Sequence, residues 1–294
     1  MKRVVIDESF LGELELLETA LKNNVAGMFG GNRRTKNLGS SCEFADYRDY
    51  MPGDDVTKID WNAYARFDKL YEKLYFDERQ MHTRIYIDAS RSMDYGTDEK
   101  AVAAVRIAAA FAYLSIAAMD KVSIYAIRGD QLEEIAVGMV GKDYYLNCIN
   151  KLNDLEFDSD SKISDAIIPS KLGYGDGYSI IISDFLTDDN YESAIDRFAE
   201  QRRDILCVQV LAREELNPQV RGKMHLFDSE TPTKFFRKKI DQDIIAAYKE
   251  ALKYVTERIK NYTESRGGHY ILMPAYMQIS ELFFDKFVSM GVLK

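Results

Sequence analysis

Short apolar runs alternate with longer amphipathic segments along most of the chain. The run Ile85-Tyr86-Ile87 is apolar and β-prone, which suits a central strand that is buried on both faces. Comparable runs recur, and segments of helical length separate most of them. This pattern predicts strands at 69–77, 85–87, 121–127, 132–137, 178–185, 205–211 and 269–273, and a hairpin formed by 223–228 and 234–239.

Segments with apolar residues at helical spacing lie between most of these strands. They predict helices at 7–23, 100–119, 143–155, 191–203, 242–265 and 279–290. In the helix at 143–155, the residues expected to face inward are Tyr144, Leu146, Ile149 and Leu152. The alternation of strands and helices predicts an α/β fold, in which an open, mostly parallel sheet has helices on both faces.

Three side chains with oxygen atoms, Asp88, Ser90 and Ser92, occupy alternate positions directly after the central strand. In an open α/β sheet, ligands bind outside the carboxyl ends of the strands. One carboxylate and two hydroxyls suit Mg²⁺ or Mn²⁺. Because these three ligands carry only one negative charge, the bound metal would stay electrophilic and could accept a carboxylate from a partner. A motif this short is also typical of a capped turn, which is the alternative interpretation.

A second acid, Asp184, lies near the end of the apolar strand predicted at 178–185. If this strand is a neighbour of the central strand, Asp88 and Asp184 flank one crevice. Ser161, in the polar loop between the two strands, can supply a further hydroxyl. The candidate metal ligands are therefore Asp88, Ser90, Ser92, Ser161 and Asp184, a set that allows octahedral coordination through side chains and water.

A dense block of aromatic and charged residues at 42–66 precedes the central strand, with a turn signal at Pro52-Gly53. We interpret the block as a folded arm, held to the main domain by Trp61 and by bidentate Arg–Asp pairs. A catalytic carboxylate pair is the alternative. The residues of structural or interaction interest are Arg48, Asp54, Asp55, Asp60, Trp61 and Arg66. The predicted division is 1–78 for the first helix and the arm, and 79–294 for the main domain.

Composition excludes several function classes. The formal net charge of −9 argues against a nucleic-acid-binding protein. The three cysteines are widely spaced, so neither a zinc site nor a disulfide framework is indicated. The longest apolar run, 107–119, is too short for a membrane span, which needs about 20 residues, and the first residues lack the apolar core of a signal peptide. We therefore expect a cytoplasmic protein without a membrane span.

The block and the Asp-x-Ser-x-Ser motif together resemble the DUF58 family. The matching pattern runs Phe44-x-x-Tyr47-Arg48-x-Tyr50-x-Pro52-Gly53-Asp54-Asp55-x-x-x-Ile59-Asp60-Trp61-x-x-x-Ala65-Arg66 and continues in Asp88-x-Ser90-x-Ser92-Met93. That family resembles von Willebrand factor type A domains, which carry a metal-ion-dependent adhesion site (MIDAS). Its genes often lie beside those of MoxR-type AAA+ ATPases.

The resemblance implies a von Willebrand A-like, Rossmann-like fold with the metal ligands in three loops. Asp88, Ser90 and Ser92 would form the first loop, and Asp184 would be the acid of the third. Ser161 stands where these domains usually have threonine, which keeps the hydroxyl but loosens its rotamer. Thr57 stands where the family often has arginine, so one ion pair of the arm is missing.

Two functions from different classes follow from these patterns. The first is a non-enzymatic, metal-dependent protein interaction module, an adaptor or chaperone-like partner of a MoxR-type ATPase or its client. The second is a Mg²⁺-dependent phosphatase or phosphotransferase with Asp88 as nucleophile. That chemistry commonly has a second acid two residues later, where this chain has Ser90. Neither a GxSxG elbow nor a GxxxxGK[ST] loop is present, so other hydrolase classes find little support.

Overall fold

The main domain is built on one six-stranded sheet with the order β10-β7-β6-β3-β4-β5. The computed structural model describes residues 5–24, 35–77, 81–95, 99–170, 176–187, 190–219, 222–227 and 235–283. The strands of this sheet are β3 (His82–Asp88), β4 (Lys121–Arg128), β5 (Gln131–Met139), β6 (Tyr178–Ser183), β7 (Asp204–Leu211) and β10 (His269–Pro274). All neighbours are parallel except β4 and β5, which form an antiparallel hairpin. The predicted fold class is confirmed.

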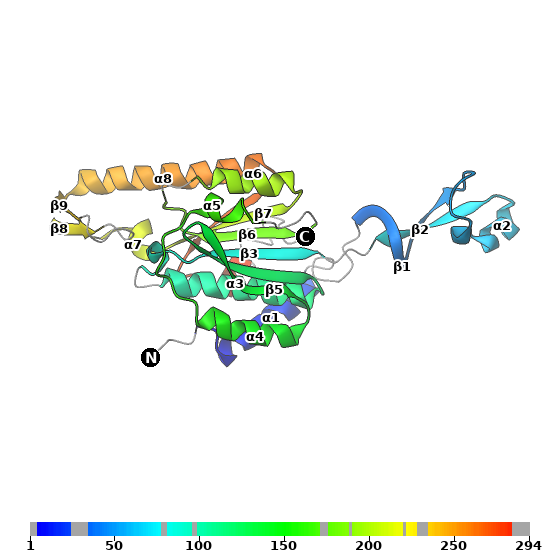
Figure 1. Cartoon of the computed structure of the whole chain (residues 1–294), viewed down its shortest axis with the longest axis horizontal. Helices are drawn as coiled ribbons and strands as arrows, with labels where there is room; N and C mark the ends of the chain where they lie inside the picture. Colours follow the sequence, from blue (N-terminus) through cyan, green and yellow to red (C-terminus); the bar gives the residue numbers. More distant parts are fainter. Residues whose placement is uncertain are drawn as a thin grey trace.

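Helices cover both faces of the sheet (Figure 1). On one face lie α1 (Glu8–Asn24), α3 (Lys100–Ala117) and α4 (Lys142–Asn153), and on the other lie α5 (Ile163–Ile167), α6 (Glu192–Glu200) and α8 (Gln242–Ser265). In β3, Ile85 and Ile87 belong to the core under α3, whereas Tyr86 belongs to the core under α6. The central strand is therefore buried on both faces, because successive side chains of a strand point to opposite sides.

Helix α4 presents a different face to the core from the one predicted. Tyr144 and Leu146 are 64% and 55% exposed, whereas Tyr145, Cys148, Ile149 and Leu152 are buried. The prediction for Tyr144 and Leu146 was wrong because the buried stripe is shifted by one residue. Its spacing of three, four and seven residues is the regular one for a helix face. The Tyr145 hydroxyl then donates a hydrogen bond of 3.0 Å to the carbonyl oxygen of Ala109 in α3.

Helix α3 is long and apolar enough to cross a membrane by length and composition alone, but 72% of it is buried inside the domain. Its residues pack on the sheet and on α1, whose Phe10, Leu14 and Leu17 belong to the same core. The first helix is thus joined to the main domain. Of the helix predicted at 279–290, the described part is α9 (Ile279–Glu281), and residues 284–294 lie outside the described residues.

The arm is a separate unit formed by β1 (Thr35–Asp49), η1 (Val56–Lys58), α2 (Trp61–Phe67) and β2 (Tyr71–Asp77). Strands β1 and β2 are antiparallel, and Figure 1 shows α2 at the end of the arm farthest from the main sheet. Trp61 is 62% exposed and packs edge-on against Tyr64 of the same helix. The structure therefore differs from the expectation that Trp61 holds the arm to the main domain. The predicted boundary between 78 and 79 lies outside the described residues.

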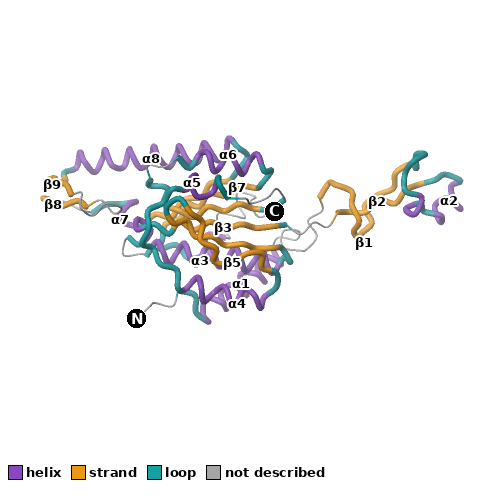
Figure 2. Tube along the Cα trace, viewed as in Figure 1, coloured by secondary structure: helices purple, strands orange, loops and turns teal. Residues whose placement is uncertain are grey.

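A second hairpin, β8 (Gly222–Phe227) and β9 (Phe235–Ile240), pairs as predicted. Figure 2 shows it at the opposite end of the molecule from the arm, next to the start of α8. The short helix α7 (Arg213–Leu216) lies between β7 and this hairpin in the chain. It carries Glu215.

His82, at the start of β3, is expected to make the protein sensitive to mild acid. Burial, together with the positive charges of Arg84 and Arg203, lowers the pKa of its imidazole from 6.5 to about 4. Between pH 6.5 and about pH 4, the imidazole of His82 binds a proton in the unfolded chain but not in the folded chain. The free energy of unfolding should therefore fall by about 1–2 kcal/mol as the pH drops through the window. Urea denaturation across it measures this loss, which His82→Gln should largely remove. An equal loss in that variant would show that another group is responsible.

Candidate functional site

The carboxylate of Asp88 lies at the carboxyl end of β3 and is 1% exposed. Its Oδ1 accepts a hydrogen bond of 3.0 Å from the backbone N–H of Ser90, and its Oδ2 accepts one of 2.5 Å from the hydroxyl of Ser183. Both oxygens are therefore oriented by the protein. Each keeps a second lone pair for another partner.

The two serines of the motif lie close together after β3. The Oγ atoms of Ser90 and Ser92 are 3.0 Å apart. Two oxygens bound at right angles to Mg²⁺, each about 2.1 Å from the metal, lie about 3.0 Å apart. The spacing of the two hydroxyls thus fits one edge of an octahedral coordination shell.

Ser161 is brought beside this motif by the loop that precedes α5. Ser159 forms a parallel bridge with Ser90, and Ser161 forms one with Gly129 after β4. The Oγ of Ser161 is buried and has no hydrogen-bond partner among the residues that the structure describes. A buried hydroxyl in this state is costly, and its oxygen is free to act as a metal ligand.

Asp184 directly follows β6, which is the parallel neighbour of β3. The adjacency on which the prediction depended is therefore confirmed. Burial is the largest cause that raises the pKa of Asp88. The negative charge of the nearby Asp184 is the second, which shows that the two carboxylates lie close together. We call Asp88, Ser90, Ser92, Ser161 and Asp184 together the crest site.

Two charged residues that the sequence did not single out, Lys100 and Glu215, lie beside the crest site. The ammonium of Lys100, at the start of α3, is fully buried, and its Nζ lies 2.8 Å from Asp184 Oδ2 and 2.7 Å from Glu215 Oε1. Burial opposes its charge, but Asp184 and Glu215 raise the pKa of Lys100 above its ordinary value, so it is an ammonium ion. A lysine at the start of a helix is ordinarily exposed, so the sequence carries no signal of this contact.

The charges at the crest site do not cancel. Lys100 offers one positive charge against the carboxylates of Asp88, Asp184 and Glu215. When all three acids are ionised, two negative charges remain in a buried region, where isolated charge is unfavourable. A divalent cation has the charge to balance them. No group of three or more His, Cys, Asp or Glu side chains with metal-binding geometry occurs in the described part of the chain, so any metal would depend on the serine hydroxyls.

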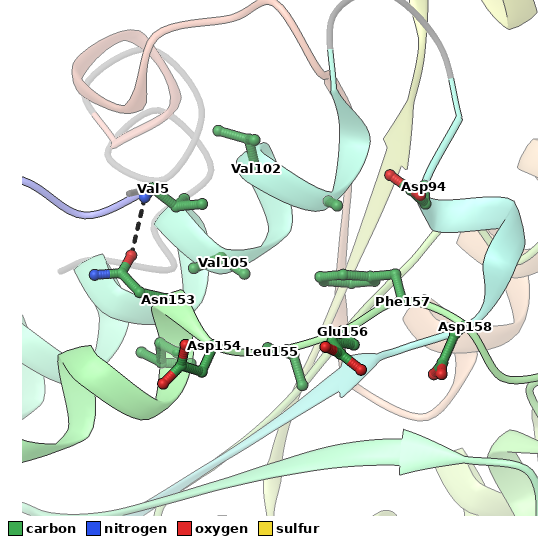
Figure 3. A pocket seen from close by; sticks show the side chains of 12 residues that line it. Val5, Asp94, Val102, Val105, Asn153, Asp154, Leu155, Glu156, Phe157 and Asp158 are labelled. Carbon is green, nitrogen blue, oxygen red and sulfur yellow. Dashed lines mark hydrogen bonds between the residues drawn. The ribbon is translucent and has the colours of Figure 1, made fainter. Parts of the chain in front are cut away.

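A hollow of about 410 Å³ opens between α3 and the segment that follows α4 (Figure 3). Its lining combines apolar side chains such as Val102, Val105 and Phe157 with four acidic residues, Asp94, Asp154, Glu156 and Asp158. Asp94 follows the Asp-x-Ser-x-Ser motif, and Asp158 precedes Ser159, whose carbonyl oxygen accepts a hydrogen bond from the Arg91 N–H. The hollow is thus connected to the crest site through the loops that carry the serines.

Arg48 is at the centre of an ion-pair network within the arm. Arg48 contacts Glu72 at 2.6 Å and Asp54 at 3.0 Å. Asp55 caps η1 through the N–H of Thr57. Of the predicted arginine–aspartate pairs, the described residues form Arg48–Asp54, which lies inside the arm.

Asp60 caps the first turn of α2 through the N–H groups of Asn62 and Ala63. Its other oxygen accepts a hydrogen bond of 2.8 Å from the Tyr47 hydroxyl and lies 3.4 Å from Lys73 Nζ. Asp60 thus connects α2 to both strands of the arm.

Comparison with known proteins identifies the family. The family described as "Protein of unknown function DUF58" matches residues 46–258, which include most of the arm and most of the sheet. The uncharacterized protein Rv1480 of Mycobacterium tuberculosis is 25% identical over 231 residues, which cover 76% of this chain and 72% of that protein.

Solved structures with a similar fold include BatB from Bacteroides thetaiotaomicron, with 14% identity and a TM-score of 0.44, covering 72% of this chain and 99% of that one. The SpRpn10 VWA domain is 11% identical with a TM-score of 0.40, and the match covers 71% of this chain and 95% of that domain. The six-stranded, mostly parallel sheet with helices on both faces is an open α/β fold. With more than half of its length matched, the chain belongs to the DUF58 family.

Proposed function

We propose that this chain is a non-enzymatic protein interaction module that depends on a divalent metal at the crest site. The observation that best supports this proposal is the buried Ser161 hydroxyl, which lacks a partner among the described residues. Leaving such a group unsatisfied costs about 1–3 kcal/mol, and a metal bound at this hydroxyl would remove that cost. The uncancelled negative charge of the crest site supports the same conclusion.

In this proposal Asp88, Ser90, Ser92 and Ser161 hold Mg²⁺ or Mn²⁺ by their oxygen atoms, with Asp184 contributing directly or through water. The bound ion would supply an electrophilic position for a carboxylate of the partner. The hollow in Figure 3 offers apolar surface on which the partner's neighbouring side chains can pack.

The partner we propose is a MoxR-type AAA+ ATPase or its client, because genes of the family often lie beside those of such ATPases. Since an AAA+ ATPase needs ATP, the proposal also places this chain in the cytoplasm. No nucleic acid takes part in it.

Substitutions at Ser161 test this proposal. Ser161→Ala removes one proposed metal ligand, and we expect it to weaken metal-dependent binding of the ATPase about tenfold. Ser161→Thr keeps the hydroxyl on a side chain with a stiffer rotamer, so this variant should bind the ATPase at least as tightly as wild type. Biolayer interferometry with the ATPase of the same organism, with Mg²⁺ or with EDTA, measures these affinities. Binding that is the same in EDTA would contradict the proposal.

A phosphatase with Asp88 as nucleophile is the alternative function. It is less well supported because Asp88 is almost fully buried, both of its oxygens accept hydrogen bonds, and Ser90 stands where a second acid is needed. Hydrolysis of p-nitrophenyl phosphate that is lost in Asp88→Ala would favour this alternative.

A further inference from the structure

The arm exposes several large apolar side chains and buries two acidic ones, which is unusual for a folded unit. Trp61, Tyr64 and Phe67 of α2 are all exposed, and Phe67 is 66% exposed. A spacing of three residues keeps them on one side of the helix. Asp60 and Glu72, by contrast, are buried. Trp61 and Tyr64 are in edge-on contact, and exposed aromatic side chains gathered on one short helix are typical of an interaction site.

The buried charges of the arm fix the position of α2. Glu72 of β2 binds Arg48 of β1, and Asp60 caps α2 while it accepts a hydrogen bond from Tyr47. The helix is thus attached to its own hairpin by charge-assisted hydrogen bonds, which are stronger than neutral ones. The exposed aromatic residues are presented on a preorganised support, which lowers the entropy lost on binding.

A hollow of about 480 Å³ lies beside Phe67, the last of these aromatic residues. Its lining consists of Tyr47, Asp60, Asn62, Ala63, Arg66, Phe67 and Tyr71. The hollow is large enough for one or two apolar side chains. Asp60 is already occupied by its hydrogen bonds, whereas Arg66 forms no ion pair with any described residue. The charge that the hollow can offer to a partner is therefore the positive charge of Arg66.

We propose that the arm tip, meaning Trp61, Tyr64, Arg66 and Phe67, is a metal-independent docking surface for a protein segment. The segment places an aromatic or large aliphatic side chain in the hollow and a neighbouring carboxylate on Arg66. Tryptophan, tyrosine and arginine are the residues that dominate binding energy at protein interfaces. An anionic membrane is a poorer occupant, because residues 46–74 carry seven acidic against five basic side chains.

This inference goes beyond the proposed function, because the arm tip shares no residue with the crest site. Figure 1 shows α2 at the outer end of the arm, away from the end of β3. A chain with two such surfaces can hold two partners, or two parts of one partner, at the same time.

The test is a selection of random twelve-residue peptides displayed on phage, against the full chain in EDTA, so that the crest site cannot contribute. We expect the enriched peptides to pair an aromatic residue or leucine with an adjacent acid. A synthetic peptide of the enriched sequence is then titrated, with the fluorescence of Trp61, the only tryptophan of the chain, as the readout. Its affinity should fall about tenfold or more in Arg66→Gln and in Phe67→Ser.

The controls separate this inference from the proposed function. Tyr144→Ser, which removes an equally exposed aromatic residue from α4, and Asp88→Ala should both leave the peptide affinity unchanged. No enrichment, enrichment without acidic residues, or equal binding by Arg66→Gln would overturn the proposal. A blue shift of Trp61 emission on phosphatidylglycerol–phosphatidylethanolamine vesicles, or dimerisation of the wild type that Phe67→Ser abolishes, would also overturn it, in favour of a membrane or a second copy.

Discussion

Replacing Lys100 with methionine is expected to lower the free energy of unfolding by about 3–5 kcal/mol, because it removes one partner of a buried ion pair. The ammonium is the cation that lies between Asp184 and Glu215, at 2.8 and 2.7 Å. Without it, the buried carboxylate of Asp184 and the partly buried carboxylate of Glu215 face each other. Asp88 is close enough for the charge of Asp184 to raise its pKa, after the larger effect of burial. Urea denaturation in EDTA measures the loss. Since the crest site becomes more negative, Mg²⁺ should restore more stability to this variant than to wild type.

Two further variants show whether burial causes this effect. Lys253→Met removes an exposed ion pair with Glu257 and should change stability by less than about 1 kcal/mol. Adding Glu215→Gln to Lys100→Met should recover part of the loss, because one buried carboxylate is then neutral. A loss in Lys100→Met no larger than in Lys253→Met would contradict the structure of the crest site.

Replacing Gly177 with alanine is expected to destabilise the domain by about 2–6 kcal/mol, through backbone strain and overpacking combined. Gly177 lies just before β6 with a φ of +134°, a conformation that residues with a Cβ rarely adopt. An added Cβ would lie 2.5 Å from the carbonyl oxygen of His82. The clash would push β6 away from β3 at the base of the two strands that carry Asp88 and Asp184.

Gly141→Ala is the matched control for this prediction. Gly141 also has a positive φ, of +90°, but an added Cβ would meet nothing within 4 Å. It should therefore show the backbone strain alone, about 1–3 kcal/mol. If thermal melting shows equal losses in the two variants, the close approach of β6 to β3 has no energetic consequence.

The features that the sequence predicted well are those that depend on neighbouring residues in the chain. Ile85-Tyr86-Ile87 is an apolar run, so its burial on both faces could be predicted. Asp88 and Asp184 each come directly after such a strand, so a single assumption, that the strands are neighbours, was enough to bring them to one edge of the sheet. The positions of Ser90, Ser92 and Ser161 follow from the same loops.

The features that escaped prediction depend on contacts between distant segments. The burial of Lys100 depends on Glu215, which is 115 residues away and is placed by the short helix after β7. In α4, the choice between Tyr144 and Tyr145 as the inward residue depends on where α3 lies, because Ala109 of α3 supplies the acceptor for Tyr145. Trp61 was expected to hold the arm to the main domain, but its surroundings are set by an arm that satisfies its polar groups internally.

The most direct test of the central claim, that the crest site binds a divalent metal, is calorimetric titration of the purified full chain with Mg²⁺ and with Mn²⁺. The proposal predicts one bound ion per chain in the wild type and no binding in an Asp88→Ala variant whose circular dichroism shows that it is folded. No binding to the wild type, or equal binding to both proteins, would contradict it.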